Sequence, residues 1–392
     1  MHGPDPGSLT AGLGEQAGIP FVLMRGGTSK AVFLRGSSLP GDPAARDALI
    51  LSVFGSPDPR QVDGLGGADL LTSKLAIIDP PTRSDADLDY TFAQVSITEP
   101  VVDFDINCGN ISAAVGAYAV DEGLVEVEEP VTRVRIHNTN TGRILLAEIP
   151  ILDGAAAVEG DHIVHGVPGT GAAIALDFGQ TAGGITGKLL PTGNESDVLD
   201  TAIGPVEATI VDLANLTVFF QAAAMDMAGT EGPEQFSDEH LAAVTAVKEA
   251  AAKLLGMPID GLIPVPAVVS PPARYNSYGT GDPVTPDDID LVARVVGGRP
   301  AVLHKAYPGT LAATTGVAAC IPGTTVHEVT RQERSGEIRI GHTSGVMPIR
   351  AAVGRDRDAW AVEEAVYYRT ARRLAEGTAF IRRAAMPAGT VG

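Results

Sequence analysis

Two stretches of this chain are apolar on every side and consist almost entirely of small residues. Residues 111–120 read ISAAVGAYAV, and residues 304–319 form a loop followed by a similar run that ends in GVAA. A helix with this composition has no polar face to present to water, so other elements must surround it. Each stretch therefore predicts a buried helix.

The segments around these two stretches are short and β-prone, and turns separate them. Residues 19–34 read as two strands around a glycine-rich turn, and residues 131–150 read as a hairpin. The 46 glycines and 28 prolines among 392 residues suit such a turn-rich chain. Strict strand–helix alternation is missing, so the pattern predicts an α+β fold in two similar domains and disfavours a doubly wound sheet. Further strands are expected at 75–78, 90–97, 206–220, 262–269, 292–296 and 339–349, and helices at 44–54, 238–255 and 358–383.

The net charge and the number of cysteines argue against some classes of protein. A net charge of −20 argues against nucleic-acid binding, because phosphate contacts need clusters of Lys and Arg. An anionic substrate must then find a locally positive pocket on an acidic protein. Two cysteines do not make a disulfide framework. Residues 1–18 resemble no signal peptide, and we find no apolar run long enough to span a membrane, so we expect a cytoplasmic protein.

Several familiar cofactor and catalytic motifs are absent from the sequence. Neither Gly64-Leu65-Gly66 nor Gly169-Thr170-Gly171 continues to the third glycine of a dinucleotide-binding loop. The phosphate loop G-x-x-x-x-G-K-[ST] and the nucleophile elbow G-x-S-x-G do not occur. The eight histidines are scattered, which argues against a zinc site. We therefore expect neither a metal nor an organic cofactor.

Two glycine-rich segments remain as candidate sites. In Arg25-Gly26-Gly27-Thr28-Ser29-Lys30, backbone N–H groups can form an anion nest and the hydroxyls can donate hydrogen bonds, although a plain tight hairpin explains these residues as well. The segment 63–74 ends in Lys74, immediately before the apolar run 75–78. A lysine that enters a buried strand loses hydration, which favours the neutral amine and so a general base. The alternative for Lys74 is an exposed lysine at a strand end.

A cysteine segment precedes the first buried helix. Asn107-Cys108-Gly109-Asn110 places a thiol at a helix N-terminus, where the helix dipole favours the thiolate. The neighbouring N–H groups can hold a carboxylate. The alternative is a small buried core cysteine. Cys320 lies at the other end of its small-residue stretch and is expected to be a core residue.

The second half offers a segment that we place opposite Cys108. His304-Lys305-Ala306-Tyr307 is followed by Thr314-Thr315-Gly316, and Thr315 with Gly316 is expected to bind a second carboxylate. The alternative interpretation is a simple helix cap.

These segments together resemble the PrpF family, whose members include methylaconitate cis–trans isomerase, oxalomesaconate tautomerase and methylitaconate isomerase. The resemblance covers about residues 19–390, and the segments occur in the family's order, which is far more specific than any one of them. Ala31 and Leu216 depart from residues usual in the family and leave the pocket shape open. The matching segments are RGGTSK (25–30), DGLGGADLLTSK (63–74), NCGNISAAVGAYA (107–119), GTGAAIALDF (169–178), KLLPTGN (188–194), IVDLAN (210–215), HKAYPGTLAATTGVAACIPGT (304–324) and GHTSG (341–345).

The resemblance implies the fold of diaminopimelate epimerase, in which two pseudo-symmetric α+β domains each wrap a barrel-like sheet around a central helix. We expect these domains at 19–187 and 188–350, with 351–392 as a C-terminal helix that packs back near the domain junction. Epimerases of this fold use two opposed cysteines, one from each domain. This chain is expected to match the first at Cys108 and to carry Thr315-Gly316 at the second place, which argues against a two-cysteine racemase.

By resemblance, Lys74 and Cys108 carry the chemistry of a cofactor-independent isomerase. One group would remove a proton next to a double bond and the other would return it at the far end, a 1,3-allylic shift. The substrate would be a small unsaturated di- or tricarboxylic acid such as methylaconitate, aconitate or 4-oxalomesaconate. Lys74 is the first choice of base and Lys30 the fallback. The expected substrate-binding residues are Arg25, Gly26, Gly27, Thr28, Ser29, Ser73, Asn107, Gly109, Asn110, Asn215, Thr315 and Gly316.

Two other functions fit the same residues. A racemase or epimerase of a chiral acid would exchange a proton without moving a double bond. A non-catalytic carboxylate-binding protein would bind such acids without exchange. The sequence leaves the oligomeric state open, with a homodimer as one option.

Overall fold

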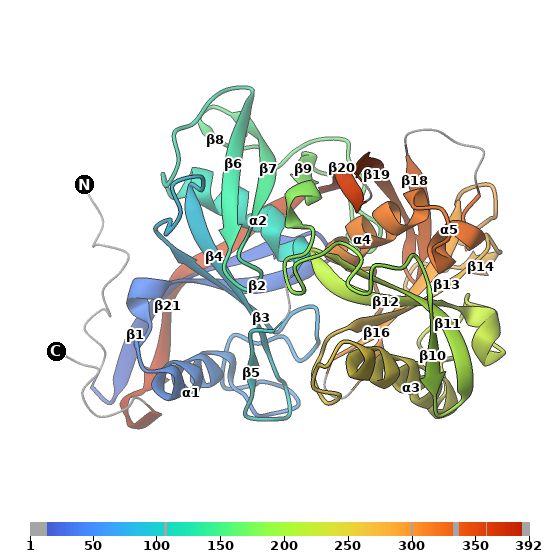
Figure 1. The fold of residues 1–392 in the computed structure, drawn as a ribbon. Helices are drawn as coiled ribbons and strands as arrows, with labels where there is room; N and C mark the ends of the chain where they lie inside the picture. Colours follow the sequence, from blue (N-terminus) through green and yellow to red (C-terminus); the bar gives the residue numbers. More distant parts are fainter. Residues whose placement is uncertain (1–13, 106–107, 299–300, 332–336, 358, 386–392) are drawn as a thin grey trace.

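The computed structural model of this protein describes residues 14–105, 108–298, 301–331, 337–357 and 359–385. Two lobes lie side by side, and a ribbon of strands passes between them (Figure 1). One helix lies inside each lobe, α2 (Gly109–Asp121) in the first and α4 (Gly309–Cys320) in the second. A second helix covers the outside of each lobe, α1 (Pro43–Phe54) and α3 (Asp238–Leu254). The four predicted helices in these regions are therefore confirmed.

The first lobe contains the predicted hairpins and strands. β1 and β2 are antiparallel, β2 and β3 are parallel, β3 and β4 are antiparallel, and β4 pairs with β6 in parallel. β6 continues antiparallel to β7, and β7 pairs with β9. The bounds are β1 (Gln16–Gly26), β2 (Ser29–Arg35), β3 (Lys74–Asp79), β4 (Leu88–Val95), β5 (Val102–Asp103), β6 (Val131–Asn138), β7 (Arg143–Leu152), β8 (Ala155–Ala156) and β9 (Ile174–Asp177).

The second lobe repeats this order of pairings. β11 and β12 are antiparallel, β12 and β13 are parallel, β13 and β16 are antiparallel, and β16 pairs with β18 in parallel before β18 turns antiparallel to β19. α3 and α4 interrupt the strands at the same places as α1 and α2. The bounds are β10 (Asp197–Thr201), β11 (Gly204–Leu213), β12 (Asn215–Gln221), β13 (Val265–Ser270), β14 (Tyr275–Asn276), β15 (Pro283–Val284), β16 (Leu291–Gly297), β17 (Val302–Leu303), α5 (Thr325–Val329), β18 (Ile338–His342) and β19 (Gly345–Asp356).

The two central helices form the core that the lobes share. Every residue of α2 from Gly109 to Val120 is buried, as is every residue of α4 from Gly309 to Ala319. Both helices belong to one apolar cluster, whereas α1 and α3 each pack on a separate cluster on the outer face of the sheet. At roughly 25 cal/mol per Å² of apolar surface, this burial supplies the main stabilisation of each lobe.

The expectation of a C-terminal helix at 351–392 is wrong for its described part, which forms strands. β19 pairs with β18 in one lobe and with β20 (Ala359–Arg369) in the other, and β21 (Ala371–Arg382) returns along β1. The segment is rich in Ala, Glu and Arg, which favour a helix, but pairing on both sides of β20 outweighs that propensity. The C-terminal strands therefore join the second lobe back to the first. The domain limits 19–187 and 188–350 stay predictions.

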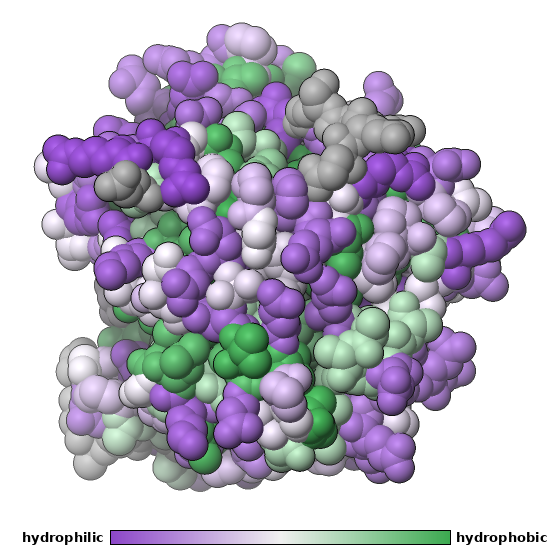
Figure 2. All heavy atoms as spheres, turned by 45° about the vertical axis from the view of Figure 1, so that its right-hand side comes forward, coloured by the Kyte–Doolittle hydropathy of each residue, from purple (hydrophilic) through white to green (hydrophobic). Residues whose placement is uncertain are grey.

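The surface agrees with an acidic, polar chain. Hydrophilic residues cover most of the face in Figure 2, and hydrophobic residues gather near its lower edge. None of the helices in the described part of the chain combines the length and apolar composition needed to cross a bilayer.

Candidate active site

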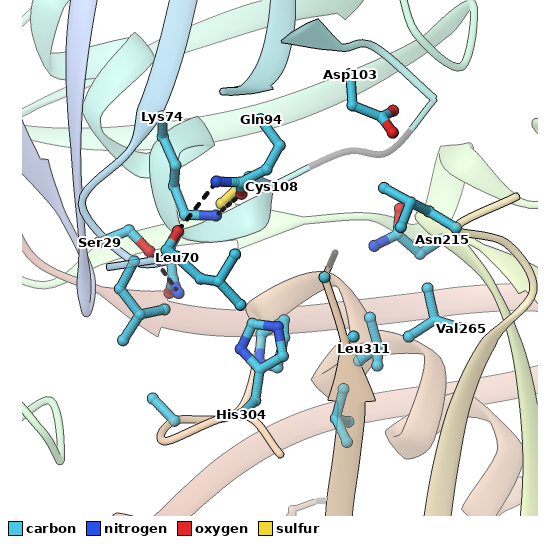
Figure 3. Close-up of a pocket in the computed structure, with 18 of the residues that line it drawn as sticks. Ser29, Leu70, Lys74, Gln94, Asp103, Cys108, Asn215, Val265, His304 and Leu311 are labelled. Atoms are coloured by element: carbon cyan, nitrogen blue, oxygen red, sulfur yellow. Dashed lines mark hydrogen bonds between the residues drawn. The ribbon is translucent and has the colours of Figure 1, made fainter. Parts of the chain in front are cut away.

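One cavity is lined by residues of both lobes. It contains about 960 Å³ of empty space, including the part that is open to solvent. Lys74, Gln94 and Cys108 come from the first lobe, and Asn215, Val265 and His304 come from the second (Figure 3). The two residues predicted to carry the chemistry therefore face the same cavity.

The strand register identifies equivalent positions of the two lobes on the wall of this cavity. In the parallel pair β2–β3, Ala31 lies opposite Lys74, and in the matching pair β12–β13, Thr217 lies opposite Val265. Cys108 and Pro308 are the N-cap residues of the two central helices. Gln94 lies opposite Lys74, and continuing the β13–β16 register by two residues puts Gly297 opposite Val265. The equivalent pairs on the cavity wall are Ser29 and Asn215, Lys74 and Val265, Gln94 and Gly297, and Cys108 and Pro308.

Lys74 is the first residue of β3, and its side chain is only 5% exposed. The Nζ atom donates a hydrogen bond to Oε1 of Gln94 at 2.8 Å and lies 5.2 Å from the centroid of the Phe92 ring. The amine is thus held in a largely apolar wall that opens to the cavity. The alternative of an exposed surface lysine is wrong.

Cys108 marks the point where the two central helices approach each other. It is buried, lies directly before α2, and is not joined to Cys320 by a disulfide. A Cβ atom on Gly109 would lie 2.1 Å from the hydroxyl oxygen of Tyr367, and so would a Cβ atom on Gly309. Only glycine allows both helix N-termini to come this close. Their positive dipole ends therefore meet beside the cavity, where they favour an anion.

Asn110 connects the predicted hairpin loop to the helix. Its Nδ2 donates to the hydroxyls of Thr28 (3.0 Å) and Ser29 (3.5 Å), and its Oδ1 accepts from Nε of Arg369 at 2.9 Å. Arg369 is buried on β20, and this burial lowers the pKa of its guanidinium. These hydrogen bonds fix the side chain of Asn110. They also place the guanidinium of Arg369 next to α2.

His304 forms the wall of the cavity opposite Lys74 (Figure 3). Its ring makes no hydrogen bond with any residue that the structure describes. Burial, and secondly the charge of Lys74, lowers the pKa of His304 to about 4. The imidazole is therefore neutral near pH 7 and offers one donor and one acceptor. Beyond His304, Leu70 and Leu71 lies an adjoining cavity whose rim carries the ion pair between Asp69 and Lys305, 3.0 Å long.

Four predicted binding residues of the hairpin segment, all described in the structure, lie outside the cavity wall. The guanidinium of Arg25 donates to the carbonyl oxygens of Gly27 and Thr370 instead. A Cβ atom on Gly26 would lie 2.3 Å from the carbonyl oxygen of Asn110, and one on Gly27 would lie 2.4 Å from its side-chain oxygen. Both glycines therefore let the hairpin touch α2. Direct contact of Arg25, Gly26, Gly27 or Thr28 with a substrate stays a prediction.

Some of the other predicted binding residues line the cavity and others do not. Ser29, Asn110 and Asn215 line the cavity. Ser73 is fully buried, and its hydroxyl donates to the carbonyl oxygen of Val95 and accepts from Gln61. Asn107 lies outside the described residues. Lys30, the fallback base, is not part of the described cavity wall.

The prediction that Thr315 and Gly316 stand opposite Cys108 is wrong. Both lie inside α4, where Thr315 shares a hydrogen bond with the Tyr307 hydroxyl at 2.8 Å and a Cβ atom on Gly316 would lie 2.5 Å from Cγ2 of Ile349. The equivalent of Gly316 is Gly116, which packs in the same way against Ile149. The true counterpart of Cys108 is Pro308, and a direct match of CGNISAAVG with PGTLAATTG would have found it.

Sequence reasoning also missed Gln94 and the roles of His304 and Arg369. Gln94 is a buried amide within the otherwise apolar run YTFAQV, and that contrast was the available signal. No local pattern marks Arg369, because its importance comes from a strand that returns from the far end of the chain. Cys320 is the half-buried last residue of α4, and burial raises its pKa.

Taken together, the cavity offers an amine, a thiol, a neutral imidazole, three side-chain amides and two helix N-termini. This set can hold negative groups and can move a proton without a metal ligand set. Among the described residues, no three His, Cys, Asp or Glu side chains converge as a metal site requires.

Comparison with known proteins places this chain in a family. The sequence profile described as PrpF protein matches residues 16–382. The chain belongs to the PrpF family. A 3-methylitaconate isomerase from Eubacterium barkeri is 48% identical, with 95% of this chain and 99% of that protein covered. A 2-methyl-aconitate isomerase from Shewanella oneidensis is 38% identical over 94% of this chain and 97% of its own length. The predicted resemblance is thus confirmed.

Solved structures support the fold of this PrpF protein. A crystal structure of methylitaconate-delta-isomerase superposes with a TM-score of 0.79 at 47% identity, covering 97% of this chain and 99% of that chain. A probable proline racemase from Agrobacterium radiobacter K84 superposes with a TM-score of 0.55 at 12% identity, covering 91% and 92%. The second likeness concerns the fold alone. The predicted α+β fold of the diaminopimelate epimerase type is confirmed.

Proposed function

We propose that this protein is an isomerase that shifts a proton, and with it a carbon–carbon double bond, in a small unsaturated di- or tricarboxylic acid. The observation that carries the proposal is the convergence of Lys74 and Cys108 on one cavity flanked by two helix N-termini. Relatives named for isomerisation of methylitaconate and methylaconitate support the reaction class.

The proposed mechanism divides the work between the two groups. One of them removes a proton from the carbon next to the double bond, which leaves a delocalised dienolate. The other returns a proton at the far end, so the double bond moves, and rotation before reprotonation gives cis–trans isomerisation. Helix N-termini and buried donors stabilise the negative charge that develops on the substrate. Lys74 is the preferred base, because its amine is buried at the start of β3, is held by Gln94 and lines the cavity.

The cavity also explains how an acidic protein binds an acidic substrate. Lys74, Arg369 and the two helix ends supply local positive charge, and Ser29, Asn110, Asn215 and neutral His304 supply hydrogen-bonding groups. Low dielectric around the cavity strengthens these interactions over their value in water. A cytoplasmic location and a homodimeric assembly stay predictions.

A panel of acids tests the proposed reaction. Purified protein is incubated separately with methylitaconate, methylaconitate, aconitate and 4-oxalomesaconate, and the products are identified by NMR. We expect double-bond migration or cis–trans isomerisation of at least one acid, loss of that turnover in Lys74→Ala, and turnover close to wild type in Lys30→Ala. Binding of these acids without turnover would favour the non-catalytic alternative, and inversion of a chiral acid would favour a racemase.

A further inference from the structure

Gln94 lies between Lys74 and the loop that precedes it. The glutamine is on β4, is 8% exposed, and is the antiparallel neighbour of Lys74. Its Oε1 accepts from Lys74 Nζ at 2.8 Å, while its Nε2 donates to the backbone oxygens of Ser73 at 2.8 Å and Leu70 at 3.3 Å. Gln94, Lys74 and Leu70 lie next to one another on the wall of the cavity (Figure 3).

These contacts determine which way the amide points. The two backbone carbonyl oxygens can only accept hydrogen bonds, so the amide nitrogen must face them. The amide oxygen must then face Lys74. A flipped amide would place its oxygen against two other oxygens, which loses both hydrogen bonds to the backbone. Gln94 is therefore a fixed acceptor at a fixed place.

A neutral acceptor suits a lysine that must gain and lose a proton. The carboxamide oxygen accepts a hydrogen bond from an ammonium and from a free amine, so it holds the nitrogen in both states. A carboxylate at this place would favour the ammonium by charge, and an apolar side chain would leave the amine free to rotate. Among the described residues, the titratable side chains that share the cavity wall with Lys74 are Asp103, Cys108 and His304.

The second lobe gives an internal comparison. The position equivalent to Lys74 is Val265, and the position equivalent to Gln94 is Gly297. The amide is thus present where the amine is present and missing where the amine is missing. A purely structural need for an amide at this point of the strand pair would apply to both lobes.

We propose that Gln94 is a positioning residue that aims the Lys74 amine at the substrate and leaves its charge free to change. The inference rests on the proposed function, because it assigns Gln94 a role only if Lys74 transfers the proton. A misplacement of about 1 Å at a reacting group can cost roughly 10²-fold in rate.

Two variants test the inference. In Gln94→Met we expect kcat to fall by about ten- to a hundredfold with KM changed by less than about threefold, because the proton transfer suffers more than binding. In Gln94→Glu we expect the limb of the kcat/KM–pH profile that belongs to Lys74 to move to higher pH by about one unit or more, because a carboxylate stabilises the ammonium. Gln221→Met is the matched control, since Gln221 contacts Glu328 and is not part of the described cavity wall.

The outcomes separate this inference from the function it rests on. If Gln94→Met keeps the wild-type kcat, or if Gln94→Glu leaves the pH profile unmoved, the positioning role is overturned. If Gln94→Met does not fold, the pH profile of Gln94→Glu decides alone, because a merely structural residue would lower stability without moving the limb. If Lys74→Ala retains turnover, the proposed function itself fails; if Lys74→Ala is inactive and both Gln94 variants behave as wild type, only the role of Gln94 is lost.

Discussion

The two lobes present the same backbone to the cavity but different side chains. Each lobe contributes the start of one strand (β2 or β12), the start of a strand parallel to it (β3 or β13) and the N-cap of a central helix. In the first lobe the last two of these positions hold Lys74 and Cys108, whereas in the second lobe they hold Val265 and Pro308. Neither Val265 nor Pro308 can transfer a proton. The symmetric fold thus provides the same backbone frame twice, and the amine and the thiol both lie on one side of it.

This asymmetry distinguishes the protein from an enzyme with one acid–base group in each lobe. A racemase needs groups on opposite faces of one carbon, so that a proton leaves on one side and returns on the other. Here the amine and the thiol both come from the first lobe, which suits removal and return of a proton at different carbons of one substrate. The second lobe supplies shape and hydrogen bonds through Asn215 and His304.

The largest expected effect is a loss of turnover, and it distinguishes the equivalent positions Lys74 and Val265. Lys74→Ala should lower turnover by about 10²–10⁴-fold, because it removes a general base, while the protein stays folded. Val265→Ala should lower turnover by less than about tenfold, because it changes packing at the cavity wall but removes no proton-transfer group. Steady-state kinetics of both variants, with circular dichroism to check the fold, makes the comparison. Equal losses in the two variants would show that the chemistry is not confined to the first lobe.

The two N-cap positions give the next comparison. Cys108→Ala should lower turnover by about 10²-fold or more, because the thiol is the second proton-transfer group, and Pro308→Ala should have a much smaller effect. Alkylation adds a check that does not need a variant. A thiol reagent should inactivate the wild type and the Cys320→Ser variant alike, and bound substrate should slow the reaction. Normal turnover in Cys108→Ala would remove the thiol from the mechanism.

A third prediction concerns the place where the N-termini of the two central helices meet. Gly109→Ala and Gly309→Ala should each destabilise the protein by about 1–3 kcal/mol, because either methyl group would collide with the hydroxyl of Tyr367. Urea unfolding measures the free-energy change. Gly41→Ala is the control and should change stability by less than about 0.5 kcal/mol, since nothing lies within 4 Å of the place that its Cβ atom would take. A large effect at Gly109 alone would mean that the helix contact is not symmetric.

The smallest expected effect is a pH dependence of stability. The pKa of His304 is about 4 in the folded protein, below its ordinary value of 6.5, so the unfolded chain takes up a proton first as the pH falls. His304 therefore costs stability progressively between about pH 6.5 and pH 4 and costs nothing above that window. His304→Gln should lose less stability than the wild type between pH 7.5 and pH 5, as measured by urea unfolding. Identical losses would contradict a buried neutral imidazole facing Lys74.

Much of the fold could be predicted from local sequence. The buried helices followed from small apolar residues on every face, and the strands around them followed from β-prone runs bounded by turns. The C-terminal segment could not be predicted in this way. Its Ala, Glu and Arg content favours a helix, and its strands exist only because β18, β9 and β1 offer partners from distant parts of the chain.

In the candidate site, too, local sequence indicates some residues and not those that depend on distant parts of the chain. Lys74, Cys108, Ser29 and Asn110 were accessible because each follows a glycine-rich loop or begins a buried element. Gln94 was not, because its function depends on a cross-strand neighbour and on two backbone carbonyl groups. Thr315 was misplaced because the two halves were not aligned on their glycines, and matching CGNISAAVG with PGTLAATTG puts Pro308 at the place of Cys108.

Proton exchange with the solvent tests the central claim most directly. The wild type and Lys74→Ala are each incubated in heavy water with the acid that the wild type turns over, and proton NMR follows both deuterium incorporation and the position of the double bond. We predict that the wild type incorporates deuterium at the carbon that gains a proton as the double bond moves, and that Lys74→Ala does neither at a comparable rate. Isomerisation by Lys74→Ala at the wild-type rate, or deuterium exchange by the wild type that inverts a centre without moving a double bond, would contradict a one-sided proton shift in this cavity.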